Sequence, residues 1–418
     1  MSDPIRVLVY GGIGSEACQT YRLALHIERL AAAGVLIEPW TPRLVHPDSY
    51  TGRWWDAVRD GVAAASLDAL NDADVVLFSR WSNTRPACTE CDADCGTPDG
   101  LALHKRETGH ASLDVDPLLR LVAAGLLANP ALRSKCAVVY DLDDDLFSQP
   151  SWIGRGAGLA RELELVQLFI RTADLVTVAT PTLARRLAPL SDHVRVVRNA
   201  VEPALYQSFP AGTAPVDRES ASPPETRIVF YGTDVRRRDY AVCRGAVDQV
   251  AADGAAGGKP VRRIWLGSDS PSVRALVDEA HPYLGSVAAF AAELAATRPD
   301  IGLASLEQSQ FAQAKSELHW LELSMVGAAT VASRLDGDEG PYSMIRHGID
   351  GMLVRGVEEW RSALMGLAAS GALRDEIAGR ARERVLAEYQ VRDRATEWAA
   401  AYRWAAAHPG IGISRFHR

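Results

Sequence analysis

The sequence DIGLASLEQSQFAQAKSELHWLELSMVGAATVAS, residues 300–333, shows the architecture of the chain most clearly. A short apolar run at 300–305 is followed by a polar loop, a segment of helical periodicity and a second apolar run at 327–333. Short apolar runs that alternate with helical segments are typical of a parallel sheet covered by helices on both faces. The segment therefore predicts a strand, a helix and a parallel strand of an α/β domain.

The same alternation extends over the whole chain. It predicts strands at 6–12, 34–40, 73–81, 136–142, 173–180, 193–200, 226–233, 261–267, 300–305, 327–333 and 351–356. Residues 202–226 contain five prolines among small polar residues, which is typical of an interdomain linker. We expect two doubly wound, Rossmann-like domains facing each other across a cleft, at 1–201 and 227–385, and a C-terminal helix at 386–418 that packs back on the first domain.

Composition limits the class of protein. The chain has 418 residues, of which 47% are hydrophobic, enough for more than one core. A formal net charge of -8 argues against attraction of the whole surface to nucleic acid or anionic membrane, although a local basic groove stays open. The sequence has no transmembrane segment of about 18 apolar residues and no signal peptide, so we expect a cytoplasmic protein, in the host cytoplasm if the chain is viral.

The helix predicted inside 300–333 carries candidate binding residues. Its N-terminus would present free N–H groups and a positive dipole end to an anion, with Lys315 and Ser316 beside them. Two turns further on, Glu322 is placed to accept hydrogen bonds from a ribose diol. The alternative is that Lys315 and Glu322 are solvated residues on an ordinary amphipathic helix.

These segments resemble a known family. The segment 300–333 and GPYSMIRHGIDGMLV (340–354) are similar to the donor domain of retaining GT-B glycosyltransferases of the family-4 type. The resemblance continues in YDLDDDLF (140–147), TADLVTVATPTLARRL (172–187) and VVRNAVEP (196–203). It implies transfer of a sugar from a nucleotide-sugar, a UDP- or GDP-sugar, with retention of configuration and without a catalytic metal.

The resemblance also implies roles for single residues. Glu322 matches the second glutamate of the family's E-x7-E motif, which holds the nucleotide ribose, whereas Ala314 stands at the position of the first. Lys315 and Glu317 are then the nearby candidates for supporting the donor sugar, and we take both as candidate catalytic residues. The basic residues expected at the diphosphate are Arg236, Arg237 and Arg238. Fixed cations there would stabilise the negative charge that grows as the glycosidic bond breaks.

Two segments of the N-terminal domain belong to the acceptor side in this interpretation. Gly11, Gly12 and Gly14 follow the first strand, and although they do not spell G-x-G-x-x-G, they let the chain approach a bound donor closely. Carboxylates crowd the end of another strand at Asp141, Asp143, Asp144 and Asp145. Such a cluster indicates a functional site, with Asp143 or Asp144 as candidate catalytic, acceptor-contacting residues. The alternative is that residues 143–145 cap the following helix.

The segment CTECDADCGTPDGLALHKRETGH (88–110) interrupts the α/β pattern. Its spacing, C-x2-C-x12-H-x5-H, lies within the range of a two-Cys, two-His zinc finger. The predicted ligands are Cys88, Cys91, His104 and His110, with Cys95 as a rival ligand. An insertion at 84–112 with almost no core would need the metal to fold, so we expect a structural zinc ion. Chance matching of the spacing is the alternative.

The finger is not expected to read a DNA sequence. Its base-reading positions fall on Thr97, Gly100 and Leu103, none of which makes a bidentate base contact. Residues 85–110 contain three Lys or Arg against five Asp or Glu, a formal balance of -2. An insertion on the acceptor domain still suits an acceptor-recognition element.

One hypothesis is therefore that the acceptor is a hydroxymethylated base in duplex DNA, flipped out of the stack as in viral-type DNA modification. Phosphate contacts would then come from the donor domain, at Arg244, Lys259, Arg262 and Arg263. A second hypothesis keeps the glycosyltransferase but gives it a cell-envelope glycan, lipid or natural product as acceptor and makes the finger structural. A third is a non-catalytic nucleic-acid-binding or scaffold protein on this fold, motivated by Ala314.

Overall fold

The structure is a computed structural model. It describes residues 3–11, 13, 17–45, 63–79, 117–150, 159–206, 225–233, 236–257, 259–267, 271–282, 284–337 and 340–416. The described residues divide into two compact units. The first unit lies within 1–14, 22–197 and 395–418, and the second within 15–21 and 198–394.

The first unit contains a six-stranded parallel sheet in the order β2-β1-β5-β6-β7-β8. Its strands are β1 (Ile5–Tyr10), β2 (Val35–Trp40), β5 (Val75–Ser79), β6 (Ala137–Leu142), β7 (Leu175–Val178) and β8 (Val194–Val196). A separate antiparallel pair is formed by β3 (Leu44–Val45) and β4 (Ala64–Ala65). Numbered in chain order without β3 and β4, these strands have the order 2-1-3-4-5-6, which is the flavodoxin-like order 2-1-3-4-5 with one further strand, β8, at the edge.

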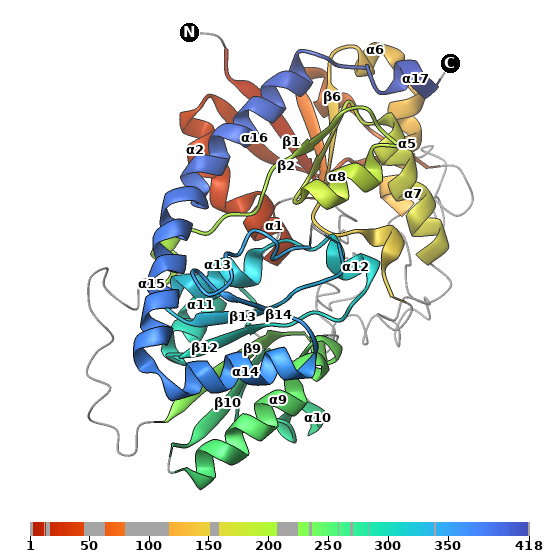
Figure 1. The fold of residues 1–418 in the computed structure, drawn as a ribbon. Helices are drawn as coiled ribbons and strands as arrows, with labels where there is room; N and C mark the ends of the chain where they lie inside the picture. The colour runs from red at the N-terminus through yellow and green to blue at the C-terminus, as the bar shows by residue number, and fades with distance from the viewer. Residues whose placement is uncertain are drawn as a thin grey trace, which may run out of the picture. The chain divides into compact units, whose positions relative to one another are not determined.

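Helices cover both faces of the first sheet (Figure 1). They are α2 (Ile27–Ala32), α5 (Pro117–Ala128), α6 (Pro130–Arg133), α7 (Leu159–Thr172), α8 (Pro181–Leu187), α16 (Val391–Ala406) and α17 (Ile413–Phe416), with 3-10 turns at Ala24–His26, Asp68–Asp72 and Leu146–Ser148. Helix α1 (Ala17–Arg22) belongs to the second unit, except for its last residue. On one face, Trp398 and Tyr402 of α16 pack with Val7 and Val9 of β1. On the other, the ring of Phe169 in α7 lies 4.6 Å from that of Phe78 in β5.

The second unit also contains a six-stranded parallel sheet, in the order β11-β10-β9-β12-β13-β14. Its strands are β9 (Thr226–Gly232), β10 (Val261–Gly267), β11 (Glu279–Pro282), β12 (Ile301–Ala304), β13 (Ala329–Ser333) and β14 (Met352–Val354). Counted along the unit, this is the Rossmann order 3-2-1-4-5-6. The direction of winding therefore reverses between β9 and β12.

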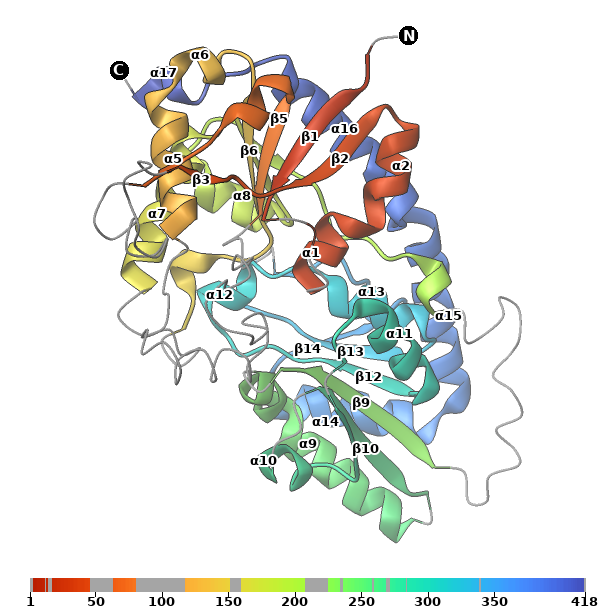
Figure 2. The same cartoon turned by 180° about the vertical axis from the view of Figure 1, so that it is seen from behind.

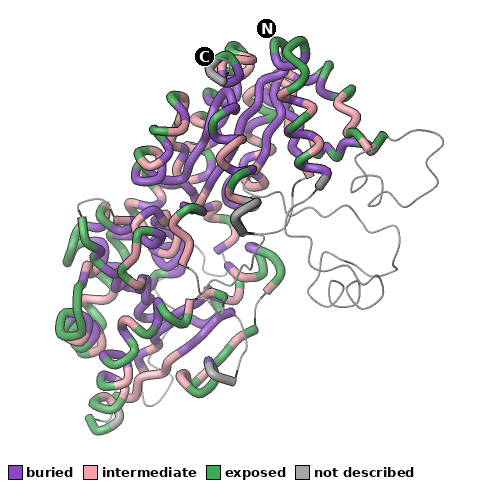
Figure 3. Tube along the Cα trace, turned by 90° about the vertical axis from the view of Figure 1, so that its right-hand side faces the viewer, coloured by how far each residue is buried: buried purple, intermediate pink, exposed green. Residues whose placement is uncertain are grey.

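Alternate side chains of the second sheet enter two cores. Ile228 and Phe230 pack under α9 and α14, whereas Val229 and Tyr231 pack under α11, α13 and α15. Figures 1 and 2 show the helices that cover this sheet. The helices of this unit are α9 (Arg237–Ala256), α10 (Pro271–Arg274), α11 (Val287–Ala296), α12 (Gln310–Gln313), α13 (Leu318–Met325), α14 (Gly356–Ala369) and α15 (Gly371–Glu388), with a 3-10 turn at Pro203–Tyr206. Figure 3 shows the strands of both sheets as mostly buried, as a sheet covered on both faces must be.

One glycine lets α13 pack closely on the sheet. A Cβ atom added to Gly302 of β12 would lie 2.4 Å from a side-chain carbon of Leu323 in α13, closer than real Cβ contacts. Leu323 therefore occupies the space that any other residue at 302 would fill. This close approach holds α13, the helix that carries Glu322, against β12.

The predicted α/β fold class is confirmed, and each of the eleven predicted strands has a counterpart. The observed strands are mostly shorter than the predicted ones, because the hydrogen-bonded pairing of two strands stops where one of them ends. The strand predicted at 193–200, for example, spans only Val194–Val196, since its neighbour β7 ends at Val178. The pattern missed β11, whose sequence EAHP alternates polar and small residues at the edge of the sheet. It also missed the two-residue strands β3 and β4.

Candidate functional site

Polar side chains gather around the carboxyl ends of β9 and β12, where the winding of the second sheet reverses. In open parallel sheets, ligands bind outside the strand ends at such a switch point. A hydrogen bond connects the segments that follow the two strands. Asp239 of α9, which follows β9, accepts it at 2.7 Å from the backbone N–H of Glu307, which follows β12. The same carboxylate accepts a 2.6 Å hydrogen bond from Arg236.

Glu322 is buried in this region and bonded to two tyrosines. Tyr21 donates to its Oε1 at 2.6 Å and Tyr231 to its Oε2 at 2.8 Å. Glu322 is 3% exposed, and this burial raises the pKa of its carboxyl group from 4.5 to about 7, against the opposing effect of the two tyrosine hydrogen bonds. The alternative interpretation of Glu322 as a solvated surface residue is therefore wrong.

The tyrosines around Glu322 form a connected group. The hydroxyl groups of Tyr21 and Tyr206 lie 3.1 Å apart, and the Tyr231 hydroxyl also lies 3.2 Å from the backbone carbonyl of His319. Burial and the Glu322 carboxylate raise the pKa of each of the three tyrosines well above 10. They are therefore neutral donors at all physiological pH values.

Arg236 lies at the end of β9 between an acid and an imidazole. Its Nη1 is 2.6 Å from Asp239, and its Nη2 is 3.2 Å and 3.3 Å from the two ring nitrogens of His319. Gly232 makes room for it: the residue has φ +144°, and a Cβ there would lie 2.5 Å from Cγ of Arg236. Of the three arginines predicted for the diphosphate, Arg236 is therefore held at the switch point.

Lys315, Ser316 and Glu317 lie together just before α13. The ammonium of Lys315 lies 4.4 Å from the ring centroid of Phe311, and Ser316 accepts a 2.9 Å hydrogen bond from Asn199. Glu317 is 1% exposed and pairs with Arg198 at 3.3 Å, while burial raises the pKa of its carboxyl group. This burial favours a role for Glu317 in holding the start of α13.

The remaining basic candidates lie elsewhere. Arg238 is more than half exposed on α9, with its Nη1 3.9 Å from a carboxylate oxygen of Glu307. The arginines suggested as phosphate contacts already face carboxylates, in the pairs Arg244–Asp248, Arg262–Glu225 and Arg263–Asp278. Parallel pairing of β9, β10 and β11 brings acids beside each of the strand arginines, so these arginines are already paired within the unit.

In the first unit, two of the clustered aspartates have structural partners. Asp141 is buried and pairs with Arg22 at 2.7 Å, while Thr177 donates to it at 2.6 Å. Asp145 caps the 3-10 turn after β6 by accepting from the N–H groups of residues 147 and 148, and it pairs with Arg186 at 2.6 Å. For Asp145, the alternative interpretation as a capping residue is therefore correct. The remaining aspartates, Asp143 and Asp144, are half-buried between them and stay the acceptor-side candidates.

Several predicted residues lie outside the described residues: Gly12 and the four zinc ligands Cys88, Cys91, His104 and His110. Within the part of the chain that the structure describes, no cluster of three or more His, Cys, Asp or Glu side chains could hold a metal ion. Cys136 and Cys243, which the structure does describe, are buried free thiols. None of the helices described here is long and apolar enough to cross a membrane.

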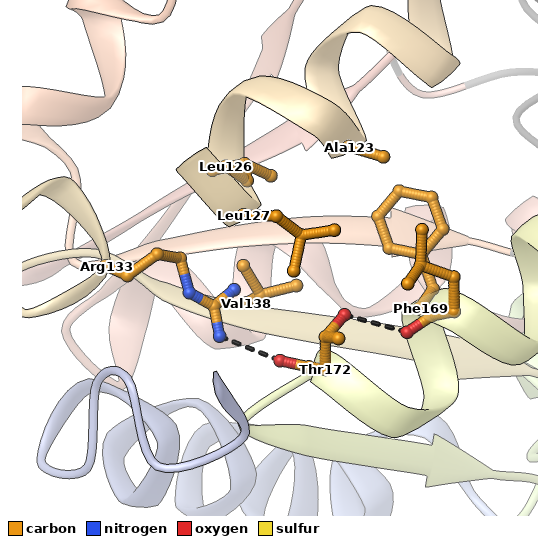
Figure 4. Close-up of a pocket in the computed structure, with 8 residues that line it drawn as sticks. Ala123, Leu126, Leu127, Arg133, Val138, Phe169 and Thr172 are labelled. Carbon is orange, nitrogen blue, oxygen red and sulfur yellow. Dashed lines mark hydrogen bonds between the residues drawn. The ribbon is translucent and has the colours of Figure 1, made fainter. Parts of the chain in front are cut away.

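A small cavity in the first unit is unrelated to these residues (Figure 4). Apolar side chains of α5 and α7 line most of it. At one end, Arg133 donates to the Thr172 carbonyl at 2.8 Å and pairs with Asp174 at 3.0 Å (Figure 4). The cavity contains none of the predicted site residues, and its charged group is compensated, so we assign it no role.

Sequence reasoning missed the residues that surround Glu322. Tyr231 and His319 lie inside apolar segments, where an aromatic residue indicates only a core position. Tyr21 lies 301 residues from Glu322 along the chain. Arg198 and Asn199 belong to VVRNAVEP, one of the segments that carried the family resemblance, and this was the one available signal for them.

Comparison with known proteins extends this description. No family model and no curated protein matches the chain. Among solved structures, HepE of Anabaena in complex with UDP and glucose has a TM-score of 0.54 and 13% identity, covering 95% of this chain and 98% of its own. Sucrose-phosphate synthase from Thermosynechococcus elongatus has a TM-score of 0.57 and 14% identity, covering 97% and 100%.

A third similar structure is WaaG, described as a glycosyltransferase involved in lipopolysaccharide biosynthesis. It has a TM-score of 0.53 and 14% identity, covering 94% of this chain and 98% of its own. At these identities the likeness is one of fold. The two Rossmann-like units of this chain therefore have the architecture of GT-B glycosyltransferases.

Proposed function

We propose that this protein is a glycosyltransferase that takes a sugar from a nucleotide-sugar bound by the second unit. The observation that carries the proposal is the gathering of Arg236, Ser316 and Glu322 around the switch point of a Rossmann sheet. The fold is shared with HepE, whose structures hold UDP and UDP-glucose. A UDP- or GDP-sugar is the donor class that this arrangement favours.

Each group has a task in donor binding. Arg236 and Lys315 supply positive charge for a diphosphate, and the hydroxyl of Ser316 is a further donor at the start of α13. Glu322 is the acceptor for ribose hydroxyls, because each carboxylate oxygen can accept a second hydrogen bond beside the one from its tyrosine. Asp143 or Asp144 would contact the acceptor from the first unit. Retention of configuration and membership of the family-4 type are supported by the sequence resemblance alone.

The position of Ala314 bears on the chemistry. Ala314 is fully buried at the C-terminal end of α12, so no carboxylate can approach the donor sugar from this position. The next residue, Lys315, carries an ammonium group and is only partly buried. We propose that positioning and electrostatic stabilisation of the leaving diphosphate supply most of the rate enhancement. If instead the loss of this carboxylate has ended catalysis, the chain is a binding protein and donor hydrolysis will be absent.

Two acceptor classes are proposed. A hydroxymethylated base in duplex DNA is favoured by the predicted finger at 84–112, and a cell-envelope glycan or lipid is favoured by the similarity to WaaG. The ion pairs of Arg262 and Arg263 weaken the DNA hypothesis, since they remove expected phosphate contacts.

The experiment is a transfer assay with radiolabelled UDP- and GDP-sugars that offers hydroxymethylated and unmodified duplex DNA as competing acceptors. Label found only on the hydroxymethylated DNA establishes a base-modifying enzyme. Donor hydrolysis without labelled DNA establishes a glycosyltransferase with another acceptor. Absence of both binding and hydrolysis for every donor contradicts the proposed function.

A further inference from the structure

His319 has a hydrogen-bond donor that the described residues leave unused. The residue lies on α13, one turn before Glu322, and its ring packs 4.5 Å from the ring of Tyr231. Its ring nitrogens contact Nη2 of Arg236, at 3.2 Å and 3.3 Å. An arginine side chain has five N–H donors and no acceptor, so it cannot accept a hydrogen bond from the imidazole.

The conclusion holds for every protonation state of the ring. A neutral imidazole has one N–H group and an imidazolium ion has two. Because Nη2 is almost equally far from both nitrogens, it lies over the ring face and not in the ring plane. At least one N–H of His319 therefore has no acceptor among the described residues. Because His319 is only half-buried, this N–H group is open to a ligand atom as its partner.

The surroundings define the chemistry of that partner. Burial and the positive charges of Arg236 and Lys315 lower the pKa of His319 well below 6.5, so the ring is a neutral donor in a positive field. Asp239 is bound to Arg236 and to the backbone of Glu307, which holds the guanidinium in place beside the ring. An anionic oxygen acceptor suits such a position better than a hydroxyl or an amide.

We propose that His319 donates a hydrogen bond to a diphosphate oxygen of the nucleotide-sugar, beside Arg236. This inference rests on the proposed function and adds a specific donor to it. The residue lies inside the loop and helix that carried the family resemblance, yet neither the motif nor the spacing indicated it. Because the proposed hydrogen bond is made to the diphosphate, the contribution of His319 to binding affinity should be confined to ligands that contain a diphosphate.

The test compares His319→Phe, which keeps a ring against Tyr231 but has no donor, with His319→Gln, which keeps an N–H group. The full-length proteins are titrated calorimetrically with UDP, GDP, uridine and guanosine. His408→Phe is the matched control, because it makes the same change at an exposed histidine of the first unit that stacks 4.5 Å from Trp404. Thermal unfolding of each variant establishes that it is folded.

We expect His319→Phe to weaken the binding of the nucleoside diphosphate about tenfold or more, the usual effect of losing a hydrogen bond to a charged group. Binding of the matching nucleoside should be unchanged, His319→Gln should restore part of the affinity, and His408→Phe should match the unaltered protein. Unchanged diphosphate binding in His319→Phe, or an equal loss for nucleoside and diphosphate, overturns the inference. If the unaltered protein binds neither UDP nor GDP, the proposed function itself fails.

Discussion

Replacing Glu322 by glutamine tests the account of the buried carboxyl group. Glutamine has nearly the same shape but does not ionise, and its side-chain oxygen can accept from one tyrosine. Burial raises the pKa of Glu322 from 4.5 to about 7 in the folded chain. The folded state therefore binds this proton more tightly than the unfolded state, so the stability contributed by the group is fully present below about pH 4.5 and is lost as the pH rises to about 7.

The size of the effect follows from the same shift. A difference of about 2.5 pKa units, at about 1.36 kcal/mol for each unit, corresponds to about 3 kcal/mol of unfolding free energy lost across this range. Glu322→Gln removes the ionisation, so its stability should not fall with pH for this reason. Relative to the unaltered protein, the variant should gain up to about 3 kcal/mol between about pH 5 and pH 8.

The assay is urea unfolding of both proteins at several pH values across this range, followed by tyrosine and tryptophan fluorescence. Glu376→Gln is the matched control, because Glu376 is an exposed carboxylate on α15, about half accessible and 2.7 Å from Arg380. Parallel stability curves for the unaltered protein and Glu322→Gln would refute the reasoning about burial. The variant should also weaken uridine binding roughly tenfold through the lost charged acceptor, and unchanged binding would refute the ribose assignment.

Three further changes test other parts of the structure. Gly302→Ala forces a methyl group against Leu323 and should lower the unfolding free energy by about 1–3 kcal/mol in urea, and a neutral result would contradict the close packing of α13. Arg22→Ala leaves the buried Asp141 without its cation and should cost about 3–5 kcal/mol, so a loss below about 1 kcal/mol would mean that the pair is not buried as described. Protein purified without chelators should contain about one zinc ion per chain by atomic emission, and Cys88→Ser should lose that zinc ion. Absence of zinc from the unaltered protein would contradict the predicted zinc finger.

The fold was predictable because both faces of each sheet are covered. Strands such as Val75–Ser79 and Ile301–Ala304 are buried on both sides and therefore appear as short, continuous apolar runs. The predicted position of Lys315 and Ser316 at the start of a helix also follows from sequence, since a polar loop after a buried strand precedes it. Strand order then places that helix at the switch point.

The partners of the site could not be predicted in this way. Tyr21 reaches Glu322 from 301 residues away, and nothing in its local sequence specifies that contact. The ion pair between Arg262 and Glu225 depends on β9 and β10 being neighbours in the sheet, which the sequence of either strand alone does not specify. His319 stands in an apolar helical segment, and nothing in that segment indicates its contact with Arg236.

The most direct test of the central claim is donor cleavage by the unaltered protein and by Arg236→Ala, measured as release of UDP or GDP from a panel of UDP- and GDP-sugars. We expect at least one donor to be bound and cleaved, slowly to water and faster when its acceptor is supplied. Arg236→Ala should reduce the rate by roughly a hundredfold, because it removes a fixed cation from the leaving diphosphate. Failure of every nucleotide-sugar to bind or to be cleaved, or equal rates for the two proteins, would contradict the account.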